Sequence, residues 1–508
     1  MKGNVEAKFS EADYLSRHPD IREAKNSNQN FDLKYHFDNF GVLEGRHLDR
    51  DIKIQIEQCL ITNSGYVFLS GWLLDSFRRK SQHESPQFSF KLKIGFYEFE
   101  IPQSSIVRYF RSDVNQTFNV QGNYDFGFVI LYKIEDNILI SNILQLIIKV
   151  DTANLAIAET KVNICSEPKL IGNYFTIFRH LLGTNNGFGA CLNAYDVQGK
   201  EIISCWQEHV KNSKAHQVIR LGSNLYEPKF SFITVLYGTT ELLQQQFHLL
   251  FADAAKLHGE IILVSNSIEI HNEVVRLSHY AQKLYNINLT LILNTDNVGF
   301  SQANNTGFSY AKSDNIVLVN PDIFPFKLTN WRRFTHVLND LNNNQIIGPF
   351  MHYSDGSVMH SGMSFHKDEI VFVPRNDFEK KLLSKKQYEY VIRIDHPQKG
   401  HLMTSFADEN VSTNHLIPVE AVSGGFMLIK RKLFEMIGGF STKYVFGHFE
   451  DADLCLKAKS KGAEILCDPN LNFVHLEGKG SKSLNELASS GSKIFNQCHF
   501  TRNHKELF

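Results

Sequence analysis

Apolar runs and amphipathic segments alternate along the chain after Pro228. Four short β-branched runs predict buried strands, namely FSFITVLYG, EIILVSNS, LTLILNTD and NIVLVNPD. Amphipathic helical spacing lies between them in TELLQQQFHLLFADAAKLHG and EVVRLSHYAQKLYN, and GFSQANNTGFSYAKS begins a further helix. Strands and helices in alternation predict a mostly parallel sheet with helices on both faces, so the expected fold class of residues 228–508 is α/β.

The pattern is different in the first 227 residues. Residues 1–50 predict a short helical module. Residues 51–165 contain alternating strands such as YVFLSGWLLD and FGFVILYKI between polar turns, which predicts a β-sandwich domain. Its aromatic residues, Trp72 among them, can fill the core or stack on sugar rings, and core filling is the usual role of strand aromatics. Residues 166–227 predict a helical linker region without recognisable chemistry.

The stretch NIVLVNPDIFPF changes abruptly from apolar to polar and back. Pro321 cannot donate to a strand ladder, so the predicted strand ends there. Asn320 and Asp322 then lie at the carboxyl end of a strand, where open α/β sheets bind ligands. A simple turn with two polar residues is the alternative interpretation of the same stretch.

Other strand ends carry candidate ligand loops. LYGTT and SNSIE follow the first two strands, where a nucleotide would lie in such a fold. NVGFSQANNTGFSYA follows the third and is rich in Gly and Asn, which permits a ligand to approach the backbone closely. The region has no Gly-x-Gly-x-x-Gly fingerprint and no phosphate loop ending in Gly-Lys-Ser/Thr, which disfavours dinucleotide and ATP sites.

Later segments add acidic residues and a histidine. VSGGFMLIKRKLFEMIGGF predicts a Gly-Gly bend, a strand and a helix. FGHFEDADLCLKAKSKGAEI begins a helix with Glu450, Asp451 and Asp453 in its first turn, and CDPNLNFVHLEGKGS places His475 at a strand end. Acidic residues in a first turn are also explained by the helix dipole, and a strand histidine is often only a hydrogen-bonded sheet residue.

Composition narrows the class of protein. The 508 residues include 53 basic and 54 acidic side chains, so the formal charge of -1 indicates neither a nucleic-acid partner nor a strongly charged membrane surface. Seven scattered cysteines predict reduced thiols in a cytoplasmic protein. The first residues lack an apolar signal segment, and the most apolar stretch, ILISNILQLIIKV, is too short to span a membrane.

Four segments in order resemble a known family. NVGFSQANNTGFSYAKSDNIVLVNPD, SGGFMLIKRKLFEMIGGF, FEDADLCLKAKSKGAEI and VHLEGKGS are similar to motifs of inverting family 2 glycosyltransferases of the GT-A fold, in particular of a rhamnosyltransferase-like bacterial branch. The resemblance extends from about Pro228 to the carboxyl terminus. YLSRHPDI and HFDNFGVLEGR, and in the sandwich GWLLD and YDFGFVI, resemble accessory regions of bacterial surface-glycan glycosyltransferases.

The resemblance implies roles for the polar residues. Asn320-Pro321-Asp322 stands at the Asp-x-Asp motif of the family, so Asp322 is expected to bind a divalent metal, Mn²⁺ or Mg²⁺, with His475 as a second ligand. Asp451 is expected to be the catalytic base, next to Glu450. One base and direct displacement imply inversion at the anomeric carbon.

The resemblance also implies binding residues on both sides of the reaction. The expected donor-binding residues are Leu236, Tyr237, Gly238, Asn266, Asn297, Gly299, Phe300, Asn304, Asn305 and Asn320. The expected acceptor-side residues are Gly424, Gly425 and His448, and the polar insertion 366–418 is expected to cover the acceptor site. Three positions depart from the family pattern: Asn320 replaces an acid of the metal motif, Ser265 replaces an acid expected near the nucleobase, and Gly238 follows Tyr237 where the family usually has Asn.

The leading hypothesis is therefore a metal-dependent inverting glycosyltransferase that uses a dTDP- or UDP-sugar donor. Its expected acceptor is a glycan or lipid-linked glycan of a bacterial surface polysaccharide, capsule or O-antigen. We expect a cytoplasmic protein without a transmembrane segment and without a nucleic-acid partner, peripheral to the inner membrane where the acceptor is lipid-linked. The alternative from another class is a catalytically inactive glycan-binding or scaffold protein that keeps the fold.

Overall fold

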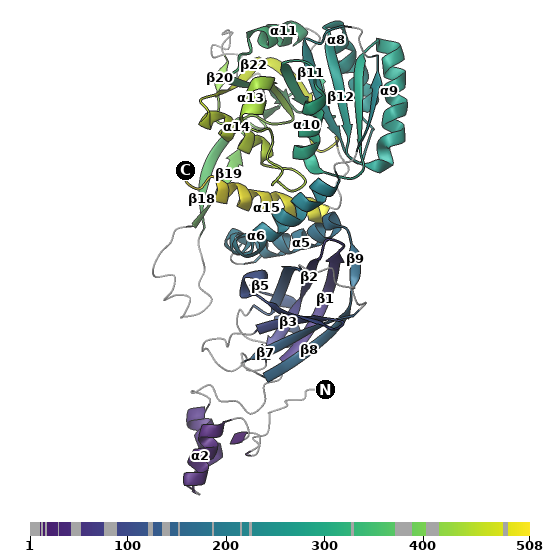
Figure 1. The fold of residues 1–508 in the computed structure, drawn as a ribbon. Helices are drawn as coiled ribbons and strands as arrows, with labels where there is room; N and C mark the ends of the chain where they lie inside the picture. Colours follow the sequence, from purple (N-terminus) through teal and green to yellow (C-terminus); the bar gives the residue numbers. More distant parts are fainter. Residues whose placement is uncertain are drawn as a thin grey trace. The chain divides into compact units, whose positions relative to one another are not determined.

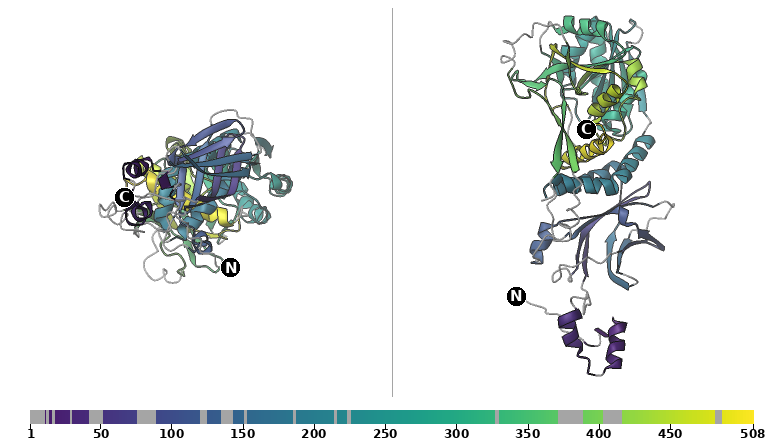
Figure 2. Two further views of the ribbon diagram at one scale, coloured as in Figure 1. Left: turned by 90° about the horizontal axis from the view of Figure 1, so that it is seen from below. Right: turned by 90° about the vertical axis from the view of Figure 1, so that its left-hand side faces the viewer.

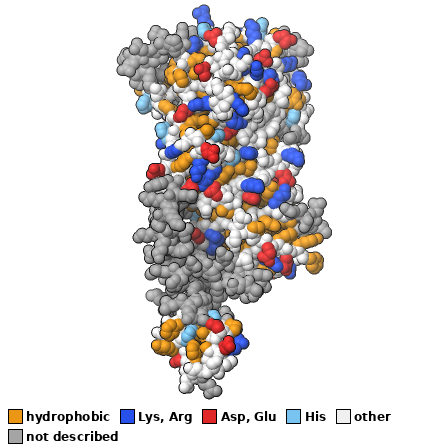
Figure 3. Space-filling model, turned by 60° about the vertical axis from the view of Figure 1, so that its left-hand side comes forward, with side chains coloured by type: hydrophobic (Ala, Val, Ile, Leu, Met, Phe, Trp, Pro, Cys, Tyr) orange, Lys and Arg blue, Asp and Glu red, His pale blue; other side chains and the backbone are white. Residues whose placement is uncertain are grey.

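The computed structural model describes the chain except residues 1–10, 12–13, 16–17, 29, 42–51, 76–88, 120–124, 135–142, 151–152, 185–186, 214–215, 223–225, 327–329, 371–388, 403–415 and 481–485. The chain forms two compact units (Figure 1). The first includes Met1–Ser166, and the second consists of Glu167–Phe372 and Gln387–Phe508. On the face that Figure 3 shows, basic and acidic side chains are interspersed.

The first unit begins with the expected helical module. It contains α2 (Pro19–Ser27), α3 (Leu33–His36) and a π-helical turn, Phe37–Gly41. Tyr14, Ile21 and Leu33 are buried together, and the Tyr14 hydroxyl is 3.0 Å from His36 Nδ1. These few apolar residues make a small core of their own.

The rest of the first unit is a β-sandwich of two sheets (Figure 2). One sheet has the order β5-β6-β2-β1-β9 and the other has the order β4-β3-β7-β8. Alternate residues of β2 and β3, such as Leu69 and Leu92, face one shared core, as the period of a half-buried strand requires. Trp72 is half-buried and packs on Phe118 at 5.4 Å between ring centroids. The elements are β1 (Ile52–Thr62), β2 (Tyr66–Asp75), β3 (Ser89–Ile94), β4 (Tyr97–Ile101), β5 (Ile106–Tyr109), α4 (Ser112–Thr117), β6 (Gly127–Lys133), β7 (Ile143–Val150), β8 (Ala153–Lys161) and β9 (Asn163–Cys165).

The second unit is built on an eleven-stranded sheet, and its α/β class is confirmed. The path through the sheet is β10-β13-β12-β11-β14-β21-β16-β22-β15, with β17 paired to β16 and β20 to β22. The strands are β10 (His216–Leu221), β11 (Phe230–Leu236), β12 (Gly259–Ser265), β13 (Asn288–Asn294), β14 (Asn315–Val319), β15 (Ile323–Pro325), β16 (Gln345–His352), β17 (Val358–His360), β20 (Ile417–Pro418), β21 (Phe426–Lys430) and β22 (Glu464–His475). A separate pair of strands is formed by β18 (Ser364–Ile370) and β19 (Glu389–Asp395).

The four predicted strands, β11 to β14, are mutually parallel as expected. The whole sheet is mixed, however, because β10 runs antiparallel to β13 and β21 runs antiparallel to β14. Beyond these four strands β16 and β22 are also parallel, but the other pairs are antiparallel, so the prediction of a mostly parallel sheet is wrong for the sheet as a whole. The apolar pattern of a strand shows that both faces are buried, but it does not encode direction.

Helices cover both faces of the parallel strands (Figure 1). On one face, Phe232 and Leu263 contact a core that includes Phe247, in the helical segment after β11, and Val274, in the helix after β12. On the other face α10 lies so close that a Cβ at Gly307 would be 2.5 Å from the Ile233 side chain. The helices are α7 (Leu243–Gln246), continued by a π-helical turn (Phe247–Phe251) into α8 (Ala252–Lys256), then α9 (His271–Tyr285), α10 (Gly299–Tyr310), α11 (Asn330–Asp340), α13 (Arg431–Met436) and α14 (Glu450–Ser460).

Three further helices pack together in the second unit (Figure 1). They are α5 (Glu167–Leu182), α6 (Gly187–Asn212) and the last helix of the chain, α15 (Glu486–Asn503). The Phe495 ring lies between those of Phe175, Phe178 and Tyr195, with centroid distances of 5.3 to 5.5 Å. A Cβ at Gly491 would be 2.1 Å from a backbone oxygen of α5, so the two helices are in close contact. Residues 167–212, which the sequence predicts only as a helical linker, thus contribute a packed layer.

We predict that residues 167–508 form a soluble fragment and that residues 228–508 do not. The shorter fragment lacks β10 and exposes the α15 face that α5 and α6 cover. Each large apolar side chain that becomes exposed removes about 1.5–3 kcal/mol of stabilisation from the fold. Soluble yield and cooperative thermal unfolding, followed by circular dichroism, distinguish the two fragments. A shorter fragment that melts cooperatively at the temperature of the longer one would contradict the prediction.

Candidate functional site

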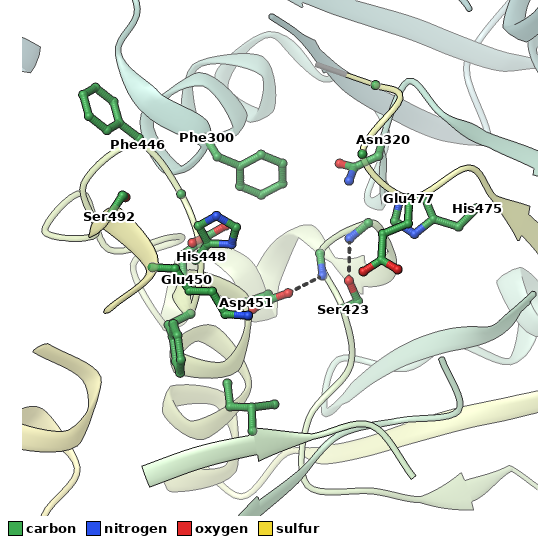
Figure 4. A pocket seen from close by; sticks show the side chains of 18 of the residues that line it. Phe300, Asn320, Ser423, Phe446, His448, Glu450, Asp451, His475, Glu477 and Ser492 are labelled. Atoms are coloured by element: carbon green, nitrogen blue, oxygen red, sulfur yellow. Dashed lines mark hydrogen bonds between the residues drawn. The ribbon is translucent and has the colours of Figure 1, made fainter. Parts of the chain in front are cut away.

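The carboxyl ends of the parallel strands open onto one cavity of about 840 Å³. Its lining comes from the loops after β11, β12, β13 and β14, the residues before β21, the start of α14 and the end of β22. Twelve of the predicted site residues line it: Tyr237, Asn266, Asn297, Phe300, Asn320, Asp322, Gly424, Gly425, His448, Glu450, Asp451 and His475. Figure 4 shows Phe300, Asn320, Asp451 and His475 around this space.

Five predicted donor-binding residues do not line the cavity. Leu236 is a buried strand end, and the Gly238 N–H donates to Ser267 Oγ at 2.7 Å. Asn304 donates to the Phe300 carbonyl at 3.0 Å, and Asn305 exchanges hydrogen bonds with the Phe440 backbone at 2.9 and 3.0 Å. Gly299, which is the fifth, has φ +76°, and a Cβ there would be 2.7 Å from the Trp206 ring. These residues shape the loops around the cavity.

Asn266 organises the loop at the start of α10. Its buried Oδ1 accepts hydrogen bonds from Asn294 Nδ2 and the Val298 N–H, both at 3.1 Å. Its Nδ2 donates to Asn297 Oδ1 at 2.9 Å, which in turn accepts from the Gly299 N–H at 2.9 Å. The amide of Asn266 therefore satisfies irregular backbone and fixes the neighbouring Asn297 in the cavity wall.

Asp322 and His475 come together through strand pairing. β15 pairs with β22 so that Ile323 lies opposite His475, and this register brings Asp322 Oδ1 within 3.2 Å of His475 Nε2. The other carboxylate oxygen accepts from the Gly480 N–H at 3.0 Å. Both side chains are nearly buried, and His475 Nδ1 has no hydrogen-bond partner among the residues that the structure describes.

The Asp322–His475 pair fits a divalent metal. Two ligand atoms at right angles, each about 2.1 Å from the ion, lie about 3.0 Å apart, which is close to the separation of the pair. A Cβ at Gly480 would be 2.8 Å from the Asp322 carboxyl carbon, so the carboxylate lies in a cradle that only glycine permits. A carboxylate suits Mn²⁺ or Mg²⁺. Within the described part of the chain no group of three or more His, Cys, Asp or Glu could hold a metal, so water and substrate oxygens would complete the shell.

A strained loop leads into α14. Phe446, His448 and Phe449 have φ values of +61°, +83° and +70°. For residues other than glycine this conformation costs about 1–3 kcal/mol each and persists only where the surroundings impose it. The Phe446 carbonyl accepts from the Phe300 N–H at 2.7 Å, which joins this loop to the start of α10. His448 is exposed within the cavity.

The carboxyl groups of Glu450 and Asp451 are both shielded from solvent but have different hydrogen-bond partners. Burial raises the pKa of both carboxyls. Asp451 accepts from the Gly424 N–H at 3.0 Å and from the Ala452 N–H at 2.8 Å, whereas Glu450 Oε2 has no partner in the described residues. The proton is therefore held more strongly by Glu450, and Asp451 remains the more acidic carboxyl. The third acid, Asp453, does not line the cavity and pairs with His504 and Lys457.

The cavity has further polar lining residues to which the sequence analysis assigned no role. Glu477 accepts from the Tyr353 hydroxyl at 2.8 Å and lies 3.3 Å from Lys399 Nζ. The described part of the insertion 366–418 contributes to the lining, and residues 371–388 and 403–415 lie outside the described residues. The lining residues without a predicted role include Asp368, Arg393, His396, Lys399, Ser423, Glu477, Ser492, Lys493 and Gln497. Ser423 and Glu477 lie within the segments SGGFMLIKRKLFEMIGGF and VHLEGKGS, although neither was assigned a role. The others come from β18, from β19 and the residues after it, and from α15, where no motif marks them.

A cavity at the carboxyl ends of the parallel strands lies where open α/β sheets bind ligands, nucleotides among them. Residues 231–406 match the family described as glycosyl transferase family 2. None of the curated proteins matches the chain. Among the described residues, no helix is both long and apolar enough to cross a membrane.

Solved structures are similar at low identity. GalNAc-T7 with UDP, GalNAc and Mn²⁺ is 14% identical with a TM-score of 0.35, over 54% of this chain and 48% of its own. The mannosyltransferase PcManGT from Pyrobaculum calidifontis with GDP-Man and Mn²⁺ is 18% identical with a TM-score of 0.33, over 61% and 69%. TarS 1-349 of S. aureus is 14% identical with a TM-score of 0.31, over 55% and 73%. The chain thus spans about half the length of the first of these proteins.

We expect UDP to stabilise the protein in the presence of Mn²⁺, and we predict that Asp322→Ala abolishes this stabilisation. The substitution removes one of the two candidate ligands and leaves the Gly480 N–H and His475 without their partner, which costs about 1–3 kcal/mol of stability by itself. Thermal unfolding with UDP, with and without Mn²⁺, measures the effect. Asp314→Ala, at the exposed amino end of β14, is the matched control and is expected to keep the stabilisation. A metal-dependent shift that survives in Asp322→Ala excludes Asp322 as a ligand.

Proposed function

We propose that the protein is a metal-dependent inverting glycosyltransferase. It transfers a sugar from a nucleoside diphosphate-sugar to a hydroxyl of a glycan acceptor. The observation that carries the proposal is the sharing of one cavity by the Asp322–His475 pair and the Asp451 carboxylate. A glycosidase would need two carboxylates flanking the bond but would not need the carboxylate–imidazole pair beside them.

Asp322 and Asp451 have different roles in the proposed reaction. Asp322 and His475 would hold a divalent ion, and such an ion would supply neutralisation of the charge that develops on the leaving diphosphate. Asp451 accepts the proton of the acceptor hydroxyl as its oxygen forms the bond to C1 of the sugar. The bond from C1 to the phosphate oxygen breaks with its electron pair on that oxygen. Attack opposite to the leaving group inverts the anomeric carbon, and no covalent intermediate is needed.

The finer assignment follows the sequence resemblance. We propose a UDP- or dTDP-sugar as the donor, with hexosyl or rhamnosyl transfer, and Mn²⁺ or Mg²⁺ as the metal. The proposed acceptor is a glycan or lipid-linked glycan in the synthesis of a bacterial surface polysaccharide, capsule or O-antigen. The proposal includes a cytoplasmic location, peripheral to the inner membrane where the acceptor is lipid-linked. The seven free cysteines support a reducing compartment.

One observation favours the alternative of an inactive glycan-binding or scaffold protein. Asn320 stands where the family has an acid, so the metal-binding motif contributes a single carboxylate, Asp322. Release of nucleoside diphosphate from a panel of nucleotide-sugars, tested with Mn²⁺ and then with a chelator, separates the two functions. Metal-dependent release supports the enzyme, and binding of glycan without any release supports the scaffold.

We predict that Asp451→Asn lowers turnover by about 10²–10⁴-fold, the usual contribution of a general base. The amide keeps the shape of the side chain, so UDP affinity with Mn²⁺ should be unchanged. Glu450→Gln is the matched control on the adjacent position and should lose much less, because Glu450 is not the proposed base and its Oε2 has no hydrogen-bond partner in the described residues. Steady-state turnover on the best donor of the panel is the measurement. An inactive Glu450→Gln beside a normal Asp451→Asn would reverse the assignment.

We predict an acid limb in the pH profile of turnover that lies above the ordinary range of aspartate. Burial raises the pKa of Asp451, and a base must be ionised to accept a proton. Activity is therefore lost as the pH falls through this raised pKa and is recovered above it. Turnover at saturating donor, measured from acidic to neutral pH, locates the limb. A limb at or below the ordinary pKa of aspartate would contradict the assignment.

A further inference from the structure

The loop that precedes α14 cannot hold its own conformation. Three of its five residues, Phe446, His448 and Phe449, have positive φ although none of them is glycine. Within the loop the Gly447 N–H donates to the Val445 carbonyl at 2.8 Å. The orientation of α14, and with it of Asp451, therefore depends on groups outside the loop.

Asn496 of α15 supplies those groups on one side. Its side chain is fully buried, and its Oδ1 accepts from the Val445 N–H at 3.1 Å. Its Nδ2 donates to the Val445 carbonyl at 3.0 Å and to the Gly447 carbonyl at 2.6 Å. Both amide protons and the amide oxygen are thus directed to the backbone of the loop. Ser492, one turn earlier on α15, donates its hydroxyl to the same Val445 carbonyl at 2.9 Å.

The loop 445–449 is also held by α10, at the proposed donor-binding part of the cavity, and by α6. The Phe446 carbonyl accepts from Phe300, and the Phe446 ring contacts Trp206 at a centroid distance of 5.0 Å. Alternate carbonyls therefore have partners on different elements: Val445 and Gly447 bond to α15, and Phe446 bonds to α10. This alternation agrees with the positive φ of Phe446, because carbonyls that point in different directions require successive peptide planes to have different orientations.

We propose that Asn496 is a positioning residue for the catalytic base. It fixes the loop 445–449 so that α14 begins at Glu450 and Asp451 reaches both the cavity and the Gly424 N–H. Asn496 itself does not line the cavity, so it acts through Asp451 and not on the substrate. The inference rests on the proposed function in one respect, namely that Asp451 is the base.

The test compares Asn496→Ala with a matched control, Asn315→Ala. Asn315 also donates its side-chain amide to a backbone carbonyl, that of Lys229, at 2.8 Å. It lies at the amino end of β14, whereas the cavity lies at the carboxyl ends of the strands. The readouts are UDP release from the best UDP-sugar donor of the panel with Mn²⁺, and UDP affinity with Mn²⁺. Asn496→Ala should lower turnover by about 10²-fold, the loss typical of a small misplacement, with UDP affinity changed by less than about three-fold. Asn315→Ala should keep both values.

A double variant tests whether the effect passes through Asp451. In Asp451→Asn the base is already lost, so adding Asn496→Ala should lower turnover by no more than about two-fold further. The proposal is overturned by a full additional loss in the double variant, by normal turnover in Asn496→Ala, or by equal losses of turnover and UDP affinity. Normal turnover in Asp451→Asn would show that Asp451 is not the base and would overturn both the proposed function of Asp451 and this inference. The other three outcomes overturn this inference alone and leave Asp451 as the base.

A second variant covers the case in which Asn496→Ala does not fold. Ser492→Ala removes one of the bonds between α15 and the loop and keeps the amide of Asn496. It should lower turnover several-fold at unchanged UDP affinity. Unchanged turnover in a folded Ser492→Ala protein would then count against the role of α15 in positioning the base.

Discussion

The antiparallel pairing of β14 with β21 determines where the candidate site can form. Val319 at the end of β14 lies opposite Phe426 at the start of β21, so the chain leaves one strand where it enters the other. The Asn320 N–H donates to the Gly425 carbonyl at 2.8 Å, which continues the pairing for one residue beyond the strands. From this point Asp322 reaches His475 through the pairing of β15 with β22, and Gly424 reaches Asp451. A register shift of one residue in this pairing would separate the two halves of the site.

The parallel strands and the polar residues at their ends could be predicted because burial on both faces leaves a direct record in the sequence. Every residue of β12 and β13 is buried, which produces the continuous apolar runs that end at Ser265 and Asn294. The mixed character of the sheet and the place of α5 and α6 left no such record. An amphipathic helix shows that one face is covered, but Phe175 and Trp206 do not indicate in the sequence that Phe495 and Phe446 cover them.

The asparagines around α10 show the limit of prediction from residue type. Asn266, Asn297, Asn304 and Asn305 were all expected to bind the donor. In the structure Asn304 and Asn305 bond to nearby backbone, and Asn266 organises the loop while its side chain reaches the cavity wall. A side-chain amide donates and accepts, so it serves an irregular backbone as well as a ligand, and the sequence alone does not distinguish these roles.

The contrast between Glu450 and Asp451 depends in part on a residue outside the helix that carries them. Both residues lie in the first turn of α14 and benefit equally from its dipole. Asp451 accepts from the Ala452 N–H within the helix and from the Gly424 N–H, which comes from the residues that lead into β21. A Cβ at Gly424 would lie 3.3 Å from the Asp451 Cβ, so a larger residue would disturb this approach. The bend before β21 therefore gives Asp451 a hydrogen bond that Glu450 lacks, and α15, through the loop 445–449, determines where the Asp451 carboxyl lies.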